Sequence, residues 1–196
     1  MSKYILAIHN GIQETNTPPV DVNNYPNVKA FMDSKIDILK KRQDKGYTIY
    51  NLRSCAYMDN FYKQKLVWTA VNSEYRFAIV PEGIFLNNSL FMITGESIEY
   101  LLGVLNSTLF KYYISIMLSG ENYAYGSATF FEQIKVLRLD KNEFKDKILE
   151  LVNSIIKNVS ENNDTREQQS ELDKLIYKVY NITQEEVNKI NEYLNI

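Results

Sequence analysis

Hydrophobic and polar positions along the first quarter of the chain predict a strand, a loop and one helix. Residues 3–8 form a short apolar stretch typical of a strand, and the polar residues 10–24 predict a loop or linker. Pro26 is placed to open a helix, because proline is tolerated in the first helical turn. Apolar residues then recur at three-to-four spacing as far as Leu39. Gly46 would end this helix after a run of cations that suits the helix dipole.

The middle of the chain carries short apolar runs separated by turn residues, which is typical of an antiparallel sheet. Residues 47–62 are aromatic and irregular. After them, Asn/Ser, Pro-Glu-Gly and Asn-Asn turns divide the sequence into expected strands. These strands are 65–71, 75–80, 84–86 and 90–93.

An apolar stripe at helical spacing follows the last expected strand. It runs from Ile98 to Met117 behind Thr94, a suitable helix cap, and predicts one long helix lying on the sheet. Residues 119–129, rich in Gly, Tyr and Ser, predict a loop, and residues 133–139 fit a returning strand.

Amphipathic segments close the chain as a helical hairpin and a short terminal helix. Two of them begin with the sequence of a capping box, Asp140 with Glu143 and Thr183 with Glu186. The apolar positions of these segments fall at 144–156, 172–180 and 187–194.

These elements predict an α+β fold: a twisted, mainly antiparallel sheet with a long packed helix and a C-terminal helical hairpin. Residues 1–139 would form the α+β body, and residues 140–196 the helical hairpin and short terminal helix. A composition of 45% hydrophobic and 13% aromatic residues is enough to bury one sizeable core or two small ones. The fifteen tyrosines, set against seven glycines and four prolines, indicate a compact body with amphipathic surface suited to recognition.

The charge distribution changes the picture of possible partners. A net charge of −2 argues weakly against nucleic acid, because phosphate binding needs a basic face. Between residues 29 and 65, however, nine basic residues stand against four acidic ones. We call the nine the basic band: Lys29, Lys35, Lys40, Lys41, Arg42, Lys45, Arg53, Lys63 and Lys65.

The residue types present argue against several kinds of catalytic site. With one cysteine, Cys55, and one histidine, His9, the chain has neither an internal disulfide nor a Cys/His zinc site. No glycine-rich loop follows a strand to hold a dinucleotide, S-adenosylmethionine or a phosphate. Residues 16–19 lack the Asn-Pro-Pro-aromatic order of amino-methyltransferases, and Glu143-x-Lys145 has nuclease spacing but no preceding Pro-Asp strand. We expect no catalytic residue, metal or cofactor in this chain.

The expected compartment follows from similar reasoning. The single cysteine fits a reducing cytoplasm, and the N-terminal apolar stretch is too short for a signal peptide. No apolar run approaches the roughly 20 residues that span a bilayer. We expect a cytoplasmic protein without a membrane partner.

A known family is indicated by segments that follow one another in order along almost the whole chain. They are Tyr25-Pro26-Asn27, Leu39-Lys40-Lys41-Arg42, Gly46, Tyr50-Asn51-Leu52-Arg53, Lys65-Leu66-Val67-Trp68, Phe91-Met92-Ile93, residues 100–107 with the signature Leu105-Asn106-Ser107, Phe110, and residues 172–187. Together they resemble the TaqI-like C-terminal specificity domain. This is the target recognition domain of type IIG restriction-modification enzymes and adenine-specific DNA methyltransferases.

The resemblance implies that the chain recognises a specific sequence in double-stranded DNA on behalf of such a methyltransferase. The family's methyltransferase and nuclease motifs normally lie upstream and are missing here, so the chain would be a fragment partnered by that upstream domain. S-adenosylmethionine would bind the missing methyltransferase domain, and no cofactor would bind this chain.

Residue chemistry suggests which side chains would contact DNA. Arg53 and Arg76 can each present a planar fork to guanine, with a structural salt bridge as the other interpretation. Cations at the end of the first helix would contact phosphates, unless they only match the helix dipole. The loop after the long helix would contact the DNA surface and help to read it, unless it is a simple connection between elements. Asn106 and Ser107 are expected to hydrogen-bond their helix to its neighbours. The predicted DNA-binding residues are Lys41, Arg42, Lys45, Arg53, Arg76, Asn122, Tyr123, Tyr125 and Ser127.

Two other functions stay open. The tyrosines and the acidic C-terminal helices would suit a protein-interaction or assembly module without DNA binding. An enzyme with an unrecognised site ranks last, because no carboxylate pair, metal cluster or nucleophile–base pair stands out in the sequence.

Overall fold

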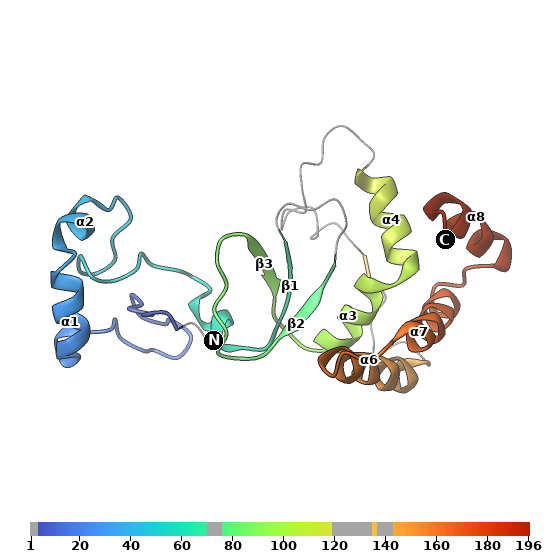
Figure 1. Ribbon diagram of the computed structural model, residues 1–196, viewed down its shortest axis with the longest axis horizontal. Helices are drawn as coiled ribbons and strands as arrows, with labels where there is room; N and C mark the ends of the chain where they lie inside the picture. Colours follow the sequence, from blue (N-terminus) through green and yellow to red (C-terminus); the bar gives the residue numbers. More distant parts are fainter. Residues whose placement is uncertain (1–3, 70–75, 119–134, 137–142) are drawn as a thin grey trace. The chain divides into compact units, whose positions relative to one another are not determined.

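A computed structural model describes residues 4–69, 76–118, 135–136 and 143–196 of the chain (Figure 1). The chain divides into two compact units, Met1–Lys63 and Gln64–Ile196. The boundary predicted between residues 139 and 140 falls outside the described residues, so it remains a prediction. The helices that follow it pack within the second unit on elements that precede it.

The first unit is built from short helices around a small core. Its helices are η1 (Val22–Asn24), α1 (Pro26–Asp33), α2 (Ile36–Lys41) and η2 (Met58–Tyr62). Among its described residues, the buried hydrophobic side chains are Ile8, Val22, Leu39 and Met58. So small a core leaves much of the stability of this unit to hydrogen bonds and ion pairs between its loops.

The single helix predicted for residues 26–46 is wrong, because the structure has two helices here. Pro26 does occupy the first turn of α1. At the break after α1, the Ser34 hydroxyl donates to the Phe31 carbonyl oxygen (2.7 Å) and competes with the helical backbone bonds. Arg42 then leaves α2 with extended backbone angles, and the chain continues as a loop.

The strand predicted for residues 3–8 is also wrong for the part that is described, residues 4–8. The backbone turns tightly here, with the Ile8 and His9 amides donating to carbonyls two residues earlier (3.0 and 2.8 Å). No strand in the described part of the first unit lies beside this segment to complete a ladder.

The second unit contains a three-stranded antiparallel sheet in the order β2-β1-β3. Its strands are β1 (Lys65–Thr69), β2 (Ala78–Val80) and β3 (Leu90–Ile93). Leu66 in the central strand lies opposite both Ile79 and Ile93, so apolar residues meet across both ladders. This arrangement confirms the predicted α+β fold with a mainly antiparallel sheet.

Two other predicted strands differ from the structure. Residues 84–86 form no ladder, because the Lys65 ammonium, buried in β1, donates to the Ile84 carbonyl oxygen (3.1 Å) and binds the segment through a side chain. Of the strand predicted at 133–139, only residues 135–136 are described, and they are not in a strand.

The long helix predicted after β3 is two helices, α3 (Ile98–Asn106) and α4 (Thr108–Leu118). The backbone at Ser107 between them is extended, and its hydroxyl donates to the Val104 carbonyl oxygen (2.7 Å). The Asp173 carboxylate accepts hydrogen bonds from the Thr108 amide and hydroxyl (2.9 and 2.7 Å). The second helix can therefore begin here, because a side chain satisfies its unpaired N-terminal amide.

Asn106 has the structural role predicted for it. Its side-chain amide pairs with both the amide and the carbonyl of Phe77 (3.0 and 2.9 Å), which ties the end of α3 to the residue before β2. The cap predicted at Thr94 is wrong, because α3 begins after Ser97, which adopts a left-handed backbone conformation (φ 58°).

Three helices close the chain as predicted: α6 (Lys145–Ser160), α7 (Arg166–Val179) and α8 (Gln184–Leu194). The capping box of Thr183 and Glu186 opens α8, whereas the other predicted cap, Asp140, lies outside the described residues. Helix α3 approaches α6 closely at Gly103, where a Cβ would lie only 2.6 Å from Val152 Cγ2.

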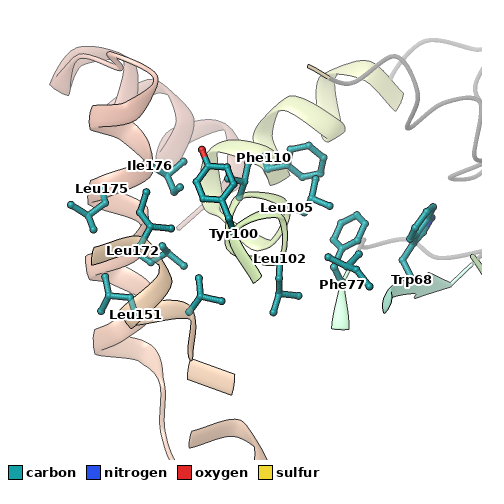
Figure 2. Close-up of a cluster of buried hydrophobic side chains, with 14 of the residues drawn as sticks. Trp68, Phe77, Tyr100, Leu102, Leu105, Phe110, Leu151, Leu172, Leu175 and Ile176 are labelled. Atoms are coloured by element: carbon teal, nitrogen blue, oxygen red, sulfur yellow. The ribbon is translucent and has the colours of Figure 1, made fainter. Parts of the chain in front are cut away.

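A hydrophobic cluster joins the sheet to the helices of the second unit (Figure 2). The rings of Trp68 and Phe77 lie 5.7 Å apart between centroids, and Phe77 meets Phe110 of α4 edge-on at 6.0 Å. Leu172 and Ile176 bring α7 into the same cluster. Within the described ranges, no helix is long and apolar enough to cross a membrane.

Candidate nucleic-acid interface

The end of the first unit that carries most of the basic band is built around a hairpin. Lys45 and Leu52 form an antiparallel bridge, and the Gly46 amide donates to the Asn51 carbonyl oxygen (3.2 Å). The chain reverses between them, where the Asn51 amide donates back to the Thr48 carbonyl oxygen (3.2 Å). We call residues 45–52 the 45–52 hairpin.

Asn51 holds this hairpin on the rest of the unit and is only 1% exposed. Its Nδ2 atom donates to the carbonyl oxygens of His9 and Val20 (both 3.0 Å), and its Oδ1 atom accepts from Thr48. Both ends of one buried amide are therefore satisfied by three separate stretches of chain, which fixes the hairpin against the N-terminal loops.

Gly46 occupies a position with no room for a larger residue. A Cβ there would lie 2.0 Å from the Leu52 carbonyl oxygen and 2.7 Å from Asn10 Oδ1. Asn10 Oδ1 also accepts from the Tyr47 amide, and Asn10 Nδ2 donates to Ser54 Oγ (2.6 Å). Asn10 thus anchors the first strand of the hairpin at Tyr47 and also binds Ser54, two residues after the hairpin ends.

A polar network joins α1 to the hairpin. The Lys29 ammonium lies 2.6 Å from Asp33 Oδ2, and the Tyr50 hydroxyl donates to Asp33 Oδ1 (2.6 Å). The Lys29 nitrogen also lies 5.7 Å from the centre of the Tyr50 ring. The hydrogen bonds from Lys29 and Tyr50 lower the pKa of Asp33, so this carboxylate stays charged and offsets the charge of Lys29.

Cations gather at the C-terminal end of α2. The Lys45 ammonium donates to the Lys40 carbonyl oxygen (2.7 Å), one of the carbonyls that the helix end leaves without a backbone partner. Lys40 and Lys41, in the last turn of α2, are both exposed. The negative end of the helix dipole partly offsets their charges.

Arg42 extends this group towards the hairpin. Its Nη2 atom donates to the carbonyl oxygens of Asp44 and Asn51 (3.2 and 2.7 Å), so the half-buried guanidinium braces the chain just before the hairpin against its second strand. We call the resulting group the α2-end cluster: Lys40, Lys41, Arg42 and Lys45.

Three residues of the basic band are paired with carboxylates or buried. Lys29 and Lys63 form ion pairs with Asp33 and Asp59. Lys65 is buried in β1, and burial lowers its pKa. In the described part of the chain, the other members form no ion pair with a carboxylate; they are Lys35, Lys40, Lys41, Arg42, Lys45 and Arg53.

The predicted DNA-binding residues fall into three groups. Four lie around the hairpin in the first unit: Lys41, Arg42, Lys45 and Arg53, which is exposed and directly follows the Lys45–Leu52 bridge. Arg76 is exposed in the second unit, immediately before Phe77 and β2. The other four, Asn122, Tyr123, Tyr125 and Ser127, lie outside the described residues.

Reasoning from the sequence missed three residues of this site: Asn10, Tyr47 and Asn51. The missed signal for the hairpin is Gly46 followed by Thr48 and Asn51, because both are turn formers that hydrogen-bond local backbone. Asn10 has no local signal, because its partners are 37 and 44 residues away in the sequence. Tyr47 is 78% exposed at the tip of the hairpin.

Exposed ammonium and guanidinium groups outnumber the exposed carboxylates of Asp37 and Asp44 in this part of the first unit, which also exposes the Tyr47 ring. An excess of cations with an aromatic ring is a chemistry that suits an anionic polymer. Among the residues that the structure describes, no group of three or more His, Cys, Asp or Glu side chains is placed to hold a metal ion.

Comparison with known proteins adds a family-level finding. The sequence model of the TaqI-like C-terminal specificity domain matches residues 21–141, which is more than half of the chain. The matched stretch includes the 45–52 hairpin, the three strands, α3 and α4. No curated protein matches the chain.

Proposed function

Because the chain belongs to the family of TaqI-like C-terminal specificity domains, with a DNA-recognition role in restriction-modification enzymes, we propose that it recognises a specific sequence in double-stranded DNA. The α2-end cluster would contact phosphates and set the register of the protein on the duplex. Arg53 would contact a base and contribute discrimination between sequences.

The observation that carries this proposal is the α2-end cluster beside an exposed hairpin. Like charges gathered at one helix end repel one another, and in the free protein backbone carbonyls and water offset that repulsion. A DNA backbone would supply negative charge at the same place. A two-stranded ribbon is also narrow enough to enter the major groove of B-form DNA.

The residues of the site would divide the work. Lys41 has no internal partner among the described residues, so it is the simplest phosphate contact. Arg42 braces the hairpin through Nη2, and its other N–H groups stay available to a phosphate. Arg53 can present its planar fork to guanine. The proposal also includes the other residues predicted to contact DNA, which are Lys45, Arg76, Asn122, Tyr123, Tyr125 and Ser127.

We assign the catalytic step to a separate, adenine-specific methyltransferase domain, with or without a nuclease. S-adenosylmethionine would bind that domain, since this sequence has neither a glycine-rich loop after a strand nor an Asn-Pro-Pro-aromatic motif. Recognition by this chain would place the target adenine within reach of the methyltransferase, which would take the base out of the stack.

The salt dependence of binding to a pool of random-sequence duplexes tests the phosphate contacts. With roughly 3 to 5 contacts, the logarithm of the affinity should fall with the logarithm of the salt concentration with a slope of about −3 to −4. Lys41→Ala removes one charge of the α2-end cluster and should reduce the slope by about one unit.

Lys157→Ala is the matched control, because Lys157 is an exposed lysine in the last turn of α6, in the other unit. It should leave the slope unchanged. Binding that does not depend on salt, or an equal change of slope in both variants, would contradict the assignment of phosphate contacts to the α2-end cluster.

A protein-interaction function is the second candidate, favoured by a groove of about 1020 Å³ along α7 and α8. Its lining combines apolar side chains such as Val187 with the polar or charged Tyr177 and Lys178. Heparin separates the two functions, because a phosphate-binding chain is retained and elutes as salt rises, whereas a purely protein-binding module passes through.

A further inference from the structure

We propose that Tyr47 reads a thymine in the major groove of DNA, through contact between its ring and the thymine methyl group. This inference rests on the proposed recognition of DNA and adds to it a base-reading residue at the tip of the 45–52 hairpin.

The backbone of Tyr47 is held in place while its ring projects from the protein. Its amide donates to Asn10 Oδ1, and the turn that follows is closed by hydrogen bonds between Thr48 and Asn51. The side chain is 78% exposed, and its ring has no aromatic or hydrogen-bonding partner among the described residues. A ring presented from a fixed backbone loses little conformational freedom on binding.

The exposed side chains of the hairpin include this ring, a cation and an apolar residue. Lys45 and Tyr47 are both exposed and are separated only by Gly46. Leu52 lies opposite Lys45 in the bridge and is 40% exposed. Gly46, by contrast, lies close to Asn10, and Asn51 is buried.

The position of Tyr47 distinguishes it from other exposed aromatic residues of the first unit. Tyr25 is 55% exposed but precedes α1, away from the hairpin in the sequence. Tyr47 follows Lys45 by two residues, and Lys45 contacts the end of α2 through the Lys40 carbonyl. If the α2-end cluster rests on phosphates, the tip of the hairpin is the adjacent part that reaches the bases.

The chemistry of the base edges selects thymine. In the major groove, guanine and adenine present hydrogen-bonding atoms that suit arginine, asparagine and glutamine, whereas thymine adds the one methyl group. The exposed ring of Tyr47, in a hairpin that also exposes Leu52, offers apolar surface, which matches that methyl group. The minor groove displays no such group, so the inference also commits the hairpin to the major groove.

Selection from a pool of short duplexes with a randomised centre gives the first test, with the full 196-residue chain. The wild-type protein should enrich an A·T pair at one or more positions. Tyr47→Ala should lose the enrichment at one of these positions and keep the salt slope. Tyr25→Ala, the matched control, should keep both. Enrichment that is the same in Tyr47→Ala and wild type, or no enrichment in the wild type, would overturn the inference.

Replacing that thymine by uracil removes only the methyl group and gives the second test. The wild-type affinity should fall about fourfold, the factor that corresponds to the burial of one such group. Tyr47→Ala should bind both duplexes equally, and Tyr47→Phe should behave like the wild type because it retains the ring. An unchanged wild-type affinity for the uracil duplex, or loss of the effect in Tyr47→Phe, would refute the methyl contact.

The two proposals fail in different ways. Absence of salt-dependent binding to any duplex would remove the proposed function itself, and this inference with it. Salt-dependent binding with a Lys41 effect, together with a Tyr47→Ala variant of unchanged selectivity, would leave the DNA-binding function intact and overturn the role of Tyr47 alone. Unchanged thermal unfolding of Tyr47→Ala would confirm that the exposed ring is not needed for folding.

Discussion

At the scale of single residues, the basic band separates into charges that are paired with carboxylates or buried and charges that remain available. Arg53 belongs to the available group, because it is exposed and forms no ion pair in the described part of the chain. On the duplex that the chain selects, Arg53→Ala should cost about 1 to 3 kcal/mol of binding free energy, with a smaller change on random duplexes. Arg53→Lys should restore charge but not selectivity, because lysine lacks the planar fork. Competition binding with the two duplexes measures both quantities, and equal losses on both would reassign Arg53 to phosphate.

At the scale of elements, the contact between α4 and α7 depends on Asp173, whose carboxylate accepts the Thr108 amide and hydroxyl. Burial raises the pKa of Asp173 above its ordinary value, and the hydrogen bonds from Thr108 oppose this rise. The Gln169 side chain, like Thr108, lowers the pKa of Asp173, although its buried nitrogen completes no hydrogen bond of good geometry. Asp173 thus caps α4 at the cost of a partly desolvated charge.

A raised folded-state pKa means that protonation of Asp173 favours the folded protein. The contribution of protonated Asp173 to the free energy of unfolding is fully present below the ordinary aspartate pKa. This contribution is lost as the pH rises through the raised pKa of the folded state. Asp173→Asn removes this charge and keeps a hydrogen-bonding group, so its stability relative to wild type should be greater at pH 7 than at pH 4. Asp173→Ala should lose about 1 to 3 kcal/mol, because the Thr108 groups are left unpaired. Urea unfolding at both pH values measures these differences, and an Asn variant with the same difference at each pH would disprove the argument.

At the scale of the whole molecule, the two units differ in how much apolar surface supports them. The described part of the first unit buries four hydrophobic side chains, whereas the second unit has an extensive cluster that spans the sheet, α3, α4, α6 and α7. We expect the first unit to open at a lower denaturant concentration than the second. Hydrogen exchange measured by mass spectrometry against denaturant should show early exchange in α1, α2 and the 45–52 hairpin. Exchange of both units at one midpoint would show that they unfold as a single cooperative body.

Much of the fold could be predicted from local patterns. The strands around Leu66, Ile79 and Ile93, the three C-terminal helices and the Thr183–Glu186 capping box follow from apolar periodicity and cap chemistry, which act over a few residues. The resemblance read from the ordered segments also agrees with the family match over residues 21–141. The excess of positive charge between residues 29 and 65 is also visible in the sequence.

Tertiary contacts decided the details that the site depends on. The long apolar stripe is continuous in the sequence, yet it breaks at Ser107 because Asp173, 65 residues away from Thr108, satisfies a new helix start. Helix α2 ends at Lys41, and Gly46 lies in the 45–52 hairpin, which Asn51 holds through hydrogen bonds to His9 and Val20. Sequence by itself therefore determined the three strands of the sheet, the C-terminal helices and the charge of each segment. Only the structure decided which cations are exposed and where Tyr47 projects. Hydrogen bonds between residues far apart in the chain produce no periodic pattern in the sequence from which they could be predicted.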